Sequence, residues 1–101
     1  MKRMVRYKLK ADRVAENEDL VRAVYAELHR VQPPGLRYAT FRLDDGLSFV
    51  HLVAYGAGSD SNTLSALPAF KAFTAGIRER CDEAPATTEL KEIGSYGFFA
   101  D

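Results

Sequence analysis

The chain has 101 residues, and its 14 lysines and arginines balance 14 aspartates and glutamates. This length suits a single domain over residues 1–101 that buries a core without disulfides. A balanced charge argues against nucleic acid or an anionic membrane surface as a partner, because both are recognised largely through positive charge. The lone Cys81 excludes an internal disulfide, and neither a signal peptide nor a membrane span is visible, so we expect a cytoplasmic protein.

The first expected elements are a strand and a long helix. Residues 4–9 are expected to form the first strand, with Val5, Tyr7 and Leu9 on one face and basic residues on the other. From residue 13 to about 31 the apolar residues recur at intervals of three, four and seven, which predicts one helical stripe: Val14, Val21, Val24, Tyr25, Leu28 and Val31. Asp12 is the expected N-cap, and Pro33-Pro34-Gly35 the expected end.

A hairpin is expected next, with strands over residues 36–43 and 47–56 joined at Asp44-Asp45-Gly46. The second strand is apolar on both faces, which is typical of a central strand covered on both sides. Its register depends on the loop. A three-residue loop places Phe41 and Phe49 on one face, whereas a two-residue loop places Phe41 opposite Val50.

The polar residues 56–62 predict a loop, the best candidate for a segment over a pocket. Pro68 is expected to open a second helix that ends before Pro85 and carries Phe70, Phe73, Ile77 and Cys81 on one stripe. Residues 86–99 are then expected to form the last strand, with a bulge or bend at Gly94.

The predicted order of strand, helix, two strands, helix and strand is that of a ferredoxin-like α+β domain, an antiparallel sheet with both helices on one face. Two helices cover only one face, while the central strands are apolar on both. A second copy of the chain is the simplest cover for the open face. We therefore expect a homodimer.

The element order, together with the opening of the second helix at residues 67–73, resembles the dimeric α+β barrel superfamily and its antibiotic-biosynthesis-monooxygenase-like domains. The resemblance implies a homodimeric barrel. Members of this superfamily include cofactor-independent monooxygenases of aromatic substrates and haem-degrading enzymes. Those domains often place a histidine between a proline and a phenylalanine here, where this chain has Ala69 between Pro68 and Phe70. The chain has no tryptophan and no histidine on the second helix, which disfavours haem cleavage.

His51 is the candidate catalytic residue, because a pocket histidine titrates near neutrality and can act as a general base. The alternative is a core histidine hydrogen-bonded to the backbone or to a tyrosine. The candidate substrate-binding residues are aromatic and would line a cavity for a small apolar or aromatic ligand, or else fill the core: Tyr7, Tyr38, Phe49, Tyr55, Phe70 and Phe73. Of these, Tyr38 and Tyr55 are expected to donate hydrogen bonds to a bound carbonyl or phenol.

Two functions remain open from the sequence. One is a cofactor-independent, monooxygenase-like enzyme acting on an aromatic or polyketide-like small molecule. The other is a non-catalytic homodimeric module that binds a small ligand or a partner, favoured by the absence of a convincing acid–base pair. In either case we expect no metal, haem or flavin, because His29, His51 and Cys81 fall on separate elements.

Overall fold

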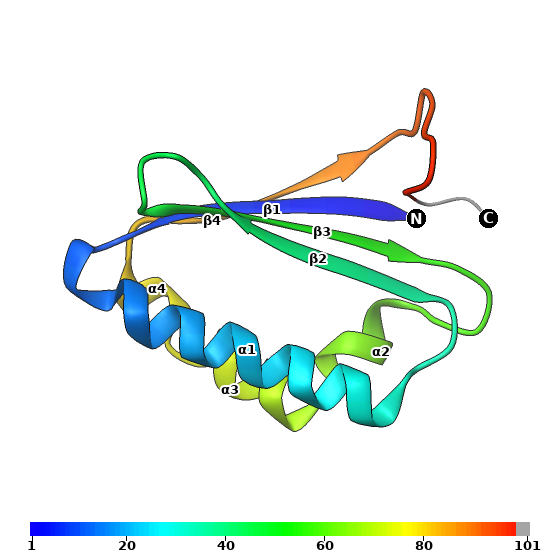
Figure 1. Ribbon diagram of the computed structural model, residues 1–101, viewed down its shortest axis with the longest axis horizontal. Helices are drawn as coiled ribbons and strands as arrows, with labels where there is room; N and C mark the ends of the chain where they lie inside the picture. Colours follow the sequence, from blue (N-terminus) through cyan, green and yellow to red (C-terminus); the bar gives the residue numbers. More distant parts are fainter. Residues whose placement is uncertain (99–101) are drawn as a thin grey trace.

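The computed structural model describes residues 1–98, which form a four-stranded antiparallel sheet with all the helices on one face (Figure 1). The strand order is β2-β3-β1-β4. The elements are β1 (Lys2–Leu9), the 3₁₀ turn η1 (Ala11–Arg13), α1 (Val14–Val31), β2 (Leu36–Arg42), β3 (Ser48–Tyr55), α2 (Ser61–Ser65), α3 (Pro68–Thr74), α4 (Ile77–Arg80) and β4 (Cys81–Leu90). The ferredoxin-like α+β fold expected from the sequence is confirmed.

The first half of the chain follows the apolar periodicity closely. Tyr7 and Leu9 of β1 are buried beneath the helices, as are Val21 and Val24 of α1. The expected N-cap was wrong, because Asp12 lies inside η1 and no side chain caps α1. The helix ends at Val31, where the left-handed backbone of Gln32 precedes the prolines.

The hairpin has the register expected of the shorter loop, with Phe41 opposite Val50. The loop itself is longer, because the Leu43 amide donates to the Ser48 carbonyl and leaves residues 44–47 outside the ladder. Asp45 holds this loop together. Its carboxylate accepts hydrogen bonds from the Ser48 hydroxyl at 2.6 Å and from the amides of Ser48 and Leu47, which lower the pKa of Asp45 to about 2.

The segment after β3 is more ordered than its composition predicts. Residues 61–65 form α2, opened by a capping box in which Asp60 accepts from the Asn62 amide at 2.8 Å and Thr63 accepts from the Asp60 amide at 3.0 Å. Gly35, with φ +78°, supports this path from below. A side chain at Gly35 would lie 2.1 Å from the Ala57 carbonyl oxygen, so only glycine lets the two loops approach.

The second long helix was wrong in length and in the place of Cys81. Pro68 opens α3 as expected, but α3 ends at Thr74 and α4 spans only Ile77–Arg80. The intervening Gly76 has φ −131°, outside the helical region, and this divides the helix. Cys81 is buried but is the first residue of β4.

The last strand starts five residues earlier than expected, at Cys81 instead of 86. Pro85 lies within it, where the register against β1 is irregular between the Arg6–Ala86 and Lys8–Glu83 pairs. Proline is tolerated there because β4 is an edge strand. The strand ends at Leu90, so Gly94 and Tyr96 follow it without strand structure, and Phe99 lies outside the described residues.

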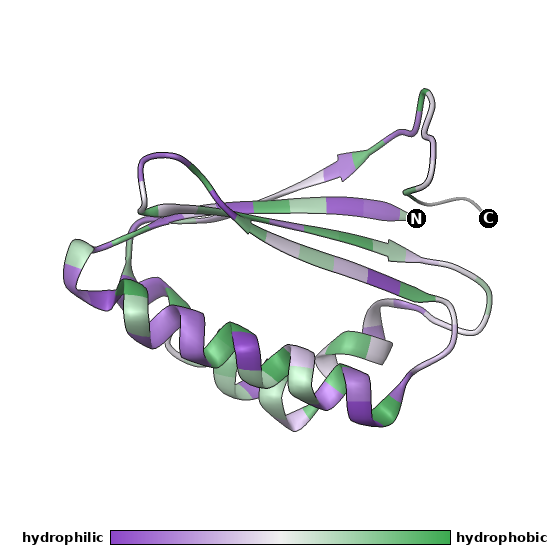
Figure 2. Cartoon of the chain, in the orientation of Figure 1, coloured by the Kyte–Doolittle hydropathy of each residue, from purple (hydrophilic) through white to green (hydrophobic). Residues whose placement is uncertain are grey.

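The two faces of the sheet have different surroundings. The inner face packs on the helices and contains the buried core, whereas no helix of residues 1–98 covers the outer face (Figures 1 and 2). From alternation along the strands, Met4, Val50 and Leu52 belong to the outer face, together with Phe41, whose side chain is 48% exposed. In the same described part of the chain, no helix is long and apolar enough to cross a membrane.

Candidate functional site

A cavity of about 310 Å³ lies between the inner face of the sheet and the helices α2 to α4. Its wall is mainly apolar, with hydroxyl groups and one guanidinium among the rings. The polar contributors besides tyrosine and histidine are Arg3 of β1, Ser61 of α2, Thr74 of α3 and Thr87 of β4. A largely apolar wall with a few placed polar groups is typical of a small-molecule site.

Six of the seven residues that the sequence singled out line this cavity: Tyr7, Tyr38, His51, Tyr55, Phe70 and Phe73. They converge because Tyr7, His51 and Tyr38 lie on the inner face of three adjacent strands, and α3 places its two phenylalanines opposite them. Phe49 is not part of the wall. It is buried and stacks on Tyr7, with ring centroids 5.6 Å apart, so it supports the wall from behind. Whether these residues bind a ligand stays a prediction.

His51 is held between two tyrosine hydroxyls. Its Nε2 lies 2.8 Å from the Tyr7 Oη, and its Nδ1 lies 2.6 Å from the Tyr38 Oη. The Thr40 hydroxyl is 3.1 Å from the same Nδ1. Burial lowers the pKa of His51 to about 4, so the imidazole is neutral at physiological pH. His51 is thus both a cavity residue and a histidine hydrogen-bonded to tyrosine, which combines the two interpretations left open by the sequence.

The hydrogen-bonded chain continues from Tyr7 to two residues that sequence reasoning missed. The Asn17 Nδ2 donates to the Tyr7 Oη at 3.0 Å, and the Arg80 Nε donates to the Asn17 Oδ1 at 3.1 Å. Arg80 also donates to the Phe73 carbonyl at 2.6 Å and lies 5.6 Å from the centroid of the Phe73 ring. Asn17 is 0% exposed and Arg80 is 2% exposed.

Spacing was the signal that could have found these two residues. Asn17 lies three positions after Val14 and four before Val21, so it falls on the apolar stripe of α1. Arg80 follows Ile77 by three positions in the same way. A polar residue on a core stripe is expected to be buried and therefore hydrogen-bonded.

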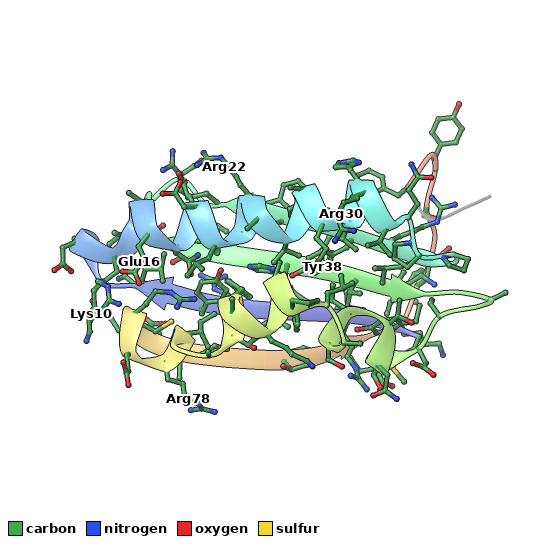
Figure 3. The ribbon with its side chains drawn as sticks, turned by 90° about the horizontal axis from the view of Figure 1, so that it is seen from below. Lys10, Glu16, Arg22, Arg30, Tyr38 and Arg78 are labelled. Carbon is green, nitrogen blue, oxygen red and sulfur yellow. The ribbon has the colours of Figure 1, made fainter. Side chains whose placement is uncertain are left out.

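At its other end, the hydrogen-bonded chain returns to α1. The Tyr25 hydroxyl lies 2.8 Å from the Thr40 hydroxyl, and the Tyr25 ring stacks on Tyr38 with centroids 5.4 Å apart. Figure 3 labels Tyr38 in the gap between α1 and α3. Burial raises the pKa of Tyr25 to about 12 and also raises the pKa values of Tyr7 and Tyr38. All three phenols therefore stay protonated and can donate hydrogen bonds.

The remaining candidate residues lie outside the hydrogen-bonded chain. His29 is exposed near the end of α1. Burial raises the pKa of the Cys81 thiol, which keeps it protonated and unreactive. Among residues 1–98, no three histidine, cysteine or carboxylate side chains gather as metal ligands. The expected absence of metal, haem and flavin stays a prediction.

Comparison with known proteins was informative only for the structure. No protein-family profile and no curated protein sequence matches the chain. A putative antibiotic biosynthesis monooxygenase from Nitrosomonas europaea superposes with a TM-score of 0.77 at 16% identity, over 92% of this chain and 98% of that one. Another, from Caulobacter crescentus, gives 0.71 at 20% identity, over 92% and 89%. SnoaB, a cofactor-independent oxygenase from Streptomyces nogalater, gives 0.60 at 19% identity, over 90% and 92%. The resemblance stated from the sequence is confirmed for the fold.

Proposed function

We propose that the chain, which has the fold of antibiotic-biosynthesis-monooxygenase-like domains, is a cofactor-independent monooxygenase-like enzyme. Its substrate is an aromatic or polyketide-like small molecule bound in the cavity. One observation carries this proposal: a neutral, buried His51 lies at the wall of an aromatic cavity with a tyrosine hydroxyl on each ring nitrogen. One solved neighbour is described as a cofactor-independent oxygenase, which supports the same class of reaction.

A flat ligand suits this wall. The centroid of the Phe70 ring lies 6.4 Å from that of Tyr38 and 6.0 Å from that of Phe73. Aromatic faces and edges of this kind favour a ring system between or beside them. The hydroxyl of Tyr38 then provides the polar contact for a ligand oxygen. His51 exchanges protons with the ligand through its tyrosine partners, because both its nitrogens are already hydrogen-bonded to tyrosine hydroxyls.

The reaction that this arrangement supports needs only dioxygen as co-substrate. A methylene activated by neighbouring rings and carbonyls loses a proton to the His51–tyrosine pair. The carbanion gives one electron to dioxygen, and the two radicals combine into a peroxide. The stored proton returns to the peroxide, and loss of the second methylene hydrogen with the O–O bond releases water. In total R₂CH₂ and O₂ become R₂C=O and H₂O, and the protein is unchanged.

The partner proposed for the protein is a second copy of itself, through the outer face. That face contains Phe41, Val50 and Leu52, and the described residues supply no helix to cover it. Ile93 and Tyr96, beyond β4, are 91% and 97% exposed and add apolar surface for a partner. A face-to-face pairing of two such sheets would bury well over ~1,000 Å², as stable interfaces do.

The second candidate function is a non-catalytic homodimeric module that binds the same kind of ligand. The engagement of both His51 nitrogens favours it, since no ring lone pair is left to contact a ligand directly. Both functions use the same cavity, and they differ only in whether the bound ligand is turned over.

Anthrone, whose central methylene is flanked by two rings, is a suitable probe. We expect the purified protein to consume dioxygen and form anthraquinone faster than the buffer control, followed by an oxygen electrode and by absorbance. His51→Gln keeps hydrogen-bonding atoms but accepts no proton, and we expect it to lose about 100-fold or more in kcat. His29→Gln is the matched control and should keep full activity. Anthrone that binds without accelerated oxidation would exclude the enzyme in favour of the binding module.

A further inference from the structure

The direction of the hydrogen bonds along the buried chain can be read from Arg80. A guanidinium only donates hydrogen bonds. The Asn17 atom 3.1 Å from the Arg80 Nε is therefore the amide oxygen, and the amide NH₂ group points to Tyr7. Tyr7 must accept this hydrogen bond, because an NH₂ group has no lone pair to offer.

Tyr7 then decides the tautomer of His51. Its oxygen accepts from Asn17, and among the described residues the other hydrogen-bond partner of that oxygen is the His51 Nε2, 2.8 Å away. The Tyr7 proton goes to this nitrogen, so the ring proton of the neutral imidazole is on Nδ1. The opposite tautomer would aim two N–H groups at the Tyr7 oxygen and leave the Tyr7 proton without an acceptor in that part of the chain.

The Nδ1–H of His51 donates to the Tyr38 oxygen at 2.6 Å. Tyr38 therefore accepts from His51 and keeps its own proton for another acceptor. Thr40 is one neighbour able to accept it, and a ligand oxygen in the cavity that Tyr38 lines is another. Tyr38 thus has a proton to donate, which a ligand oxygen in the cavity can take in place of Thr40.

The positive charge of Arg80, at the far end of the hydrogen-bonded chain, also favours a negatively charged ligand. Arg80 is 2% exposed, and within residues 1–98 no carboxylate lies within ion-pair distance of it, whereas every ion pair recorded there is partly exposed. An interior positive charge without a carboxylate partner stabilises negative charge placed nearby. Phe73 connects the two regions, since its carbonyl binds Arg80 and its ring lines the cavity.

We propose that Arg80 and Asn17 are positioning residues that hold His51 with its proton on Nδ1 and Tyr38 as a donor, so that the cavity selects an ionised aromatic hydroxyl, a phenolate or enolate. The location of the ligand rests on the proposed function. The tautomer does not, because it is a property of the protein without ligand.

The tautomer is measured on the free protein by ¹⁵N NMR of the imidazole rings. The sequence contains two histidines, and the exposed His29 provides an internal reference. We expect the His51 spectrum to show a protonated Nδ1 and an unprotonated Nε2 at pH 7. A proton on Nε2, or an even mixture, would overturn the proposal.

Asn17→Asp should reverse the direction of the hydrogen bonds from residue 17 through Tyr7 to His51. The carboxylate accepts from Arg80 and from Tyr7, so Tyr7 turns its proton away from His51, and the ring proton moves to Nε2. The matched control is Asn62→Asp, the same change at an exposed position outside the cavity wall, which should leave the Nδ1 proton in place. An Asn17→Asp spectrum identical to that of the control would contradict the proposed direction.

Tyr7→Phe tests the link without adding charge, and it keeps the result interpretable if Asn17→Asp does not fold. Removing the donor to Nε2 should end the exclusive Nδ1 protonation. Exclusive Nδ1 protonation in a folded Tyr7→Phe protein would show that Tyr7 does not set the tautomer.

Alizarin, a dihydroxyanthraquinone whose visible spectrum separates neutral from ionised molecules, tests the ligand class. We expect the wild type to bind the ionised form about tenfold more tightly than the neutral form, the size of one charge-assisted hydrogen bond. Asn17→Asp should remove this preference and Asn62→Asp should keep it. Equal binding of both forms by the wild type overturns the selection of an anion. If anthrone is not oxidised but the tautomer and alizarin results hold, only the proposed catalysis fails.

Discussion

The two faces of the sheet differ in how their residues are covered. The inner face is closed by the chain's own helices and still contains a continuous chain of polar groups from Arg80 to Tyr38. The outer face is apolar around Val50 and Leu52 and has no helix over it in the described residues. The proposed chemistry and the proposed assembly therefore use separate surfaces. A change on one face should leave the other intact.

The largest expected effect is on the outer face. Leu52→Arg would place a charge on each copy in the proposed interface, and we expect the dimer to lose about 5 kcal/mol or more, enough to leave monomers at micromolar concentration. Light scattering during size exclusion should report twice 11.2 kDa for the wild type and 11.2 kDa for the variant.

Ala26→Arg, on the exposed side of α1, is the matched control and should remain dimeric. A wild type that elutes as a monomer would remove the proposed assembly. A Leu52→Arg protein that remains dimeric would place the interface elsewhere.

The next effect concerns the polar chain of the inner face. Arg80→Ala removes the donor to Asn17 and to the Phe73 carbonyl and leaves a void, so we expect the free energy of unfolding to fall by about 3 to 4 kcal/mol. Urea denaturation measures this. Arg78→Ala is the control on the same short helix, because Arg78 is exposed and points away from the protein (Figure 3), and it should change stability by less than about 0.5 kcal/mol. Equal effects of the two variants would mean that Arg80 contributes no more than a surface arginine.

The smallest of the three effects is a pH dependence from His51. The unfolded chain binds a proton at His51 below pH 6.5, whereas burial lowers the pKa to about 4 in the folded protein. Stability is therefore complete above pH 6.5 and falls as the pH decreases toward 4, by about 2 to 3 kcal/mol for this group. Carboxylates add to the loss at the acid end, so the slope is compared between wild type, His51→Gln and His29→Gln. Only His51→Gln should flatten it between pH 6.5 and 5. If the stability of His51→Gln depends on pH with the same slope as that of the wild type, other groups cause the pH dependence.

The first half of the fold was predictable because its patterns are local. The spacing of apolar residues in 13–31 and the alternation around Tyr7 and Val53 each repeat often enough to be read without tertiary context. The second half was not. Pro85 was interpreted as the end of a helix, although an edge strand accepts a proline, and the place of a strand in the sheet is not visible in its own sequence. Likewise, the Asp60–Thr63 capping box lay within a segment whose polar composition indicated a loop.

The candidate site was predictable in part for the same reason. His51 and the tyrosines could be grouped because alternation places them on the inner faces of their strands. Asn17 and Arg80 could not be linked to them from the sequence, since they are separated by 63 positions and meet only when α4 packs beside the start of α1. Their partners are set by packing between elements, which no local periodicity encodes.

The irregular course of β4 limits how copies of this protein can associate. Pro85 has no amide hydrogen, and the register of β4 shifts on both sides of Lys8, so this edge offers an interrupted row of donors and acceptors to an incoming strand. At the opposite edge, β2 has Arg37 and Arg42, whose side chains are exposed. Growth by adding strand to strand, the route to fibrils, is thereby discouraged at both edges. The proposed association of two copies through the outer face would bury this apolar surface in a single step, so the resulting assembly would be finite.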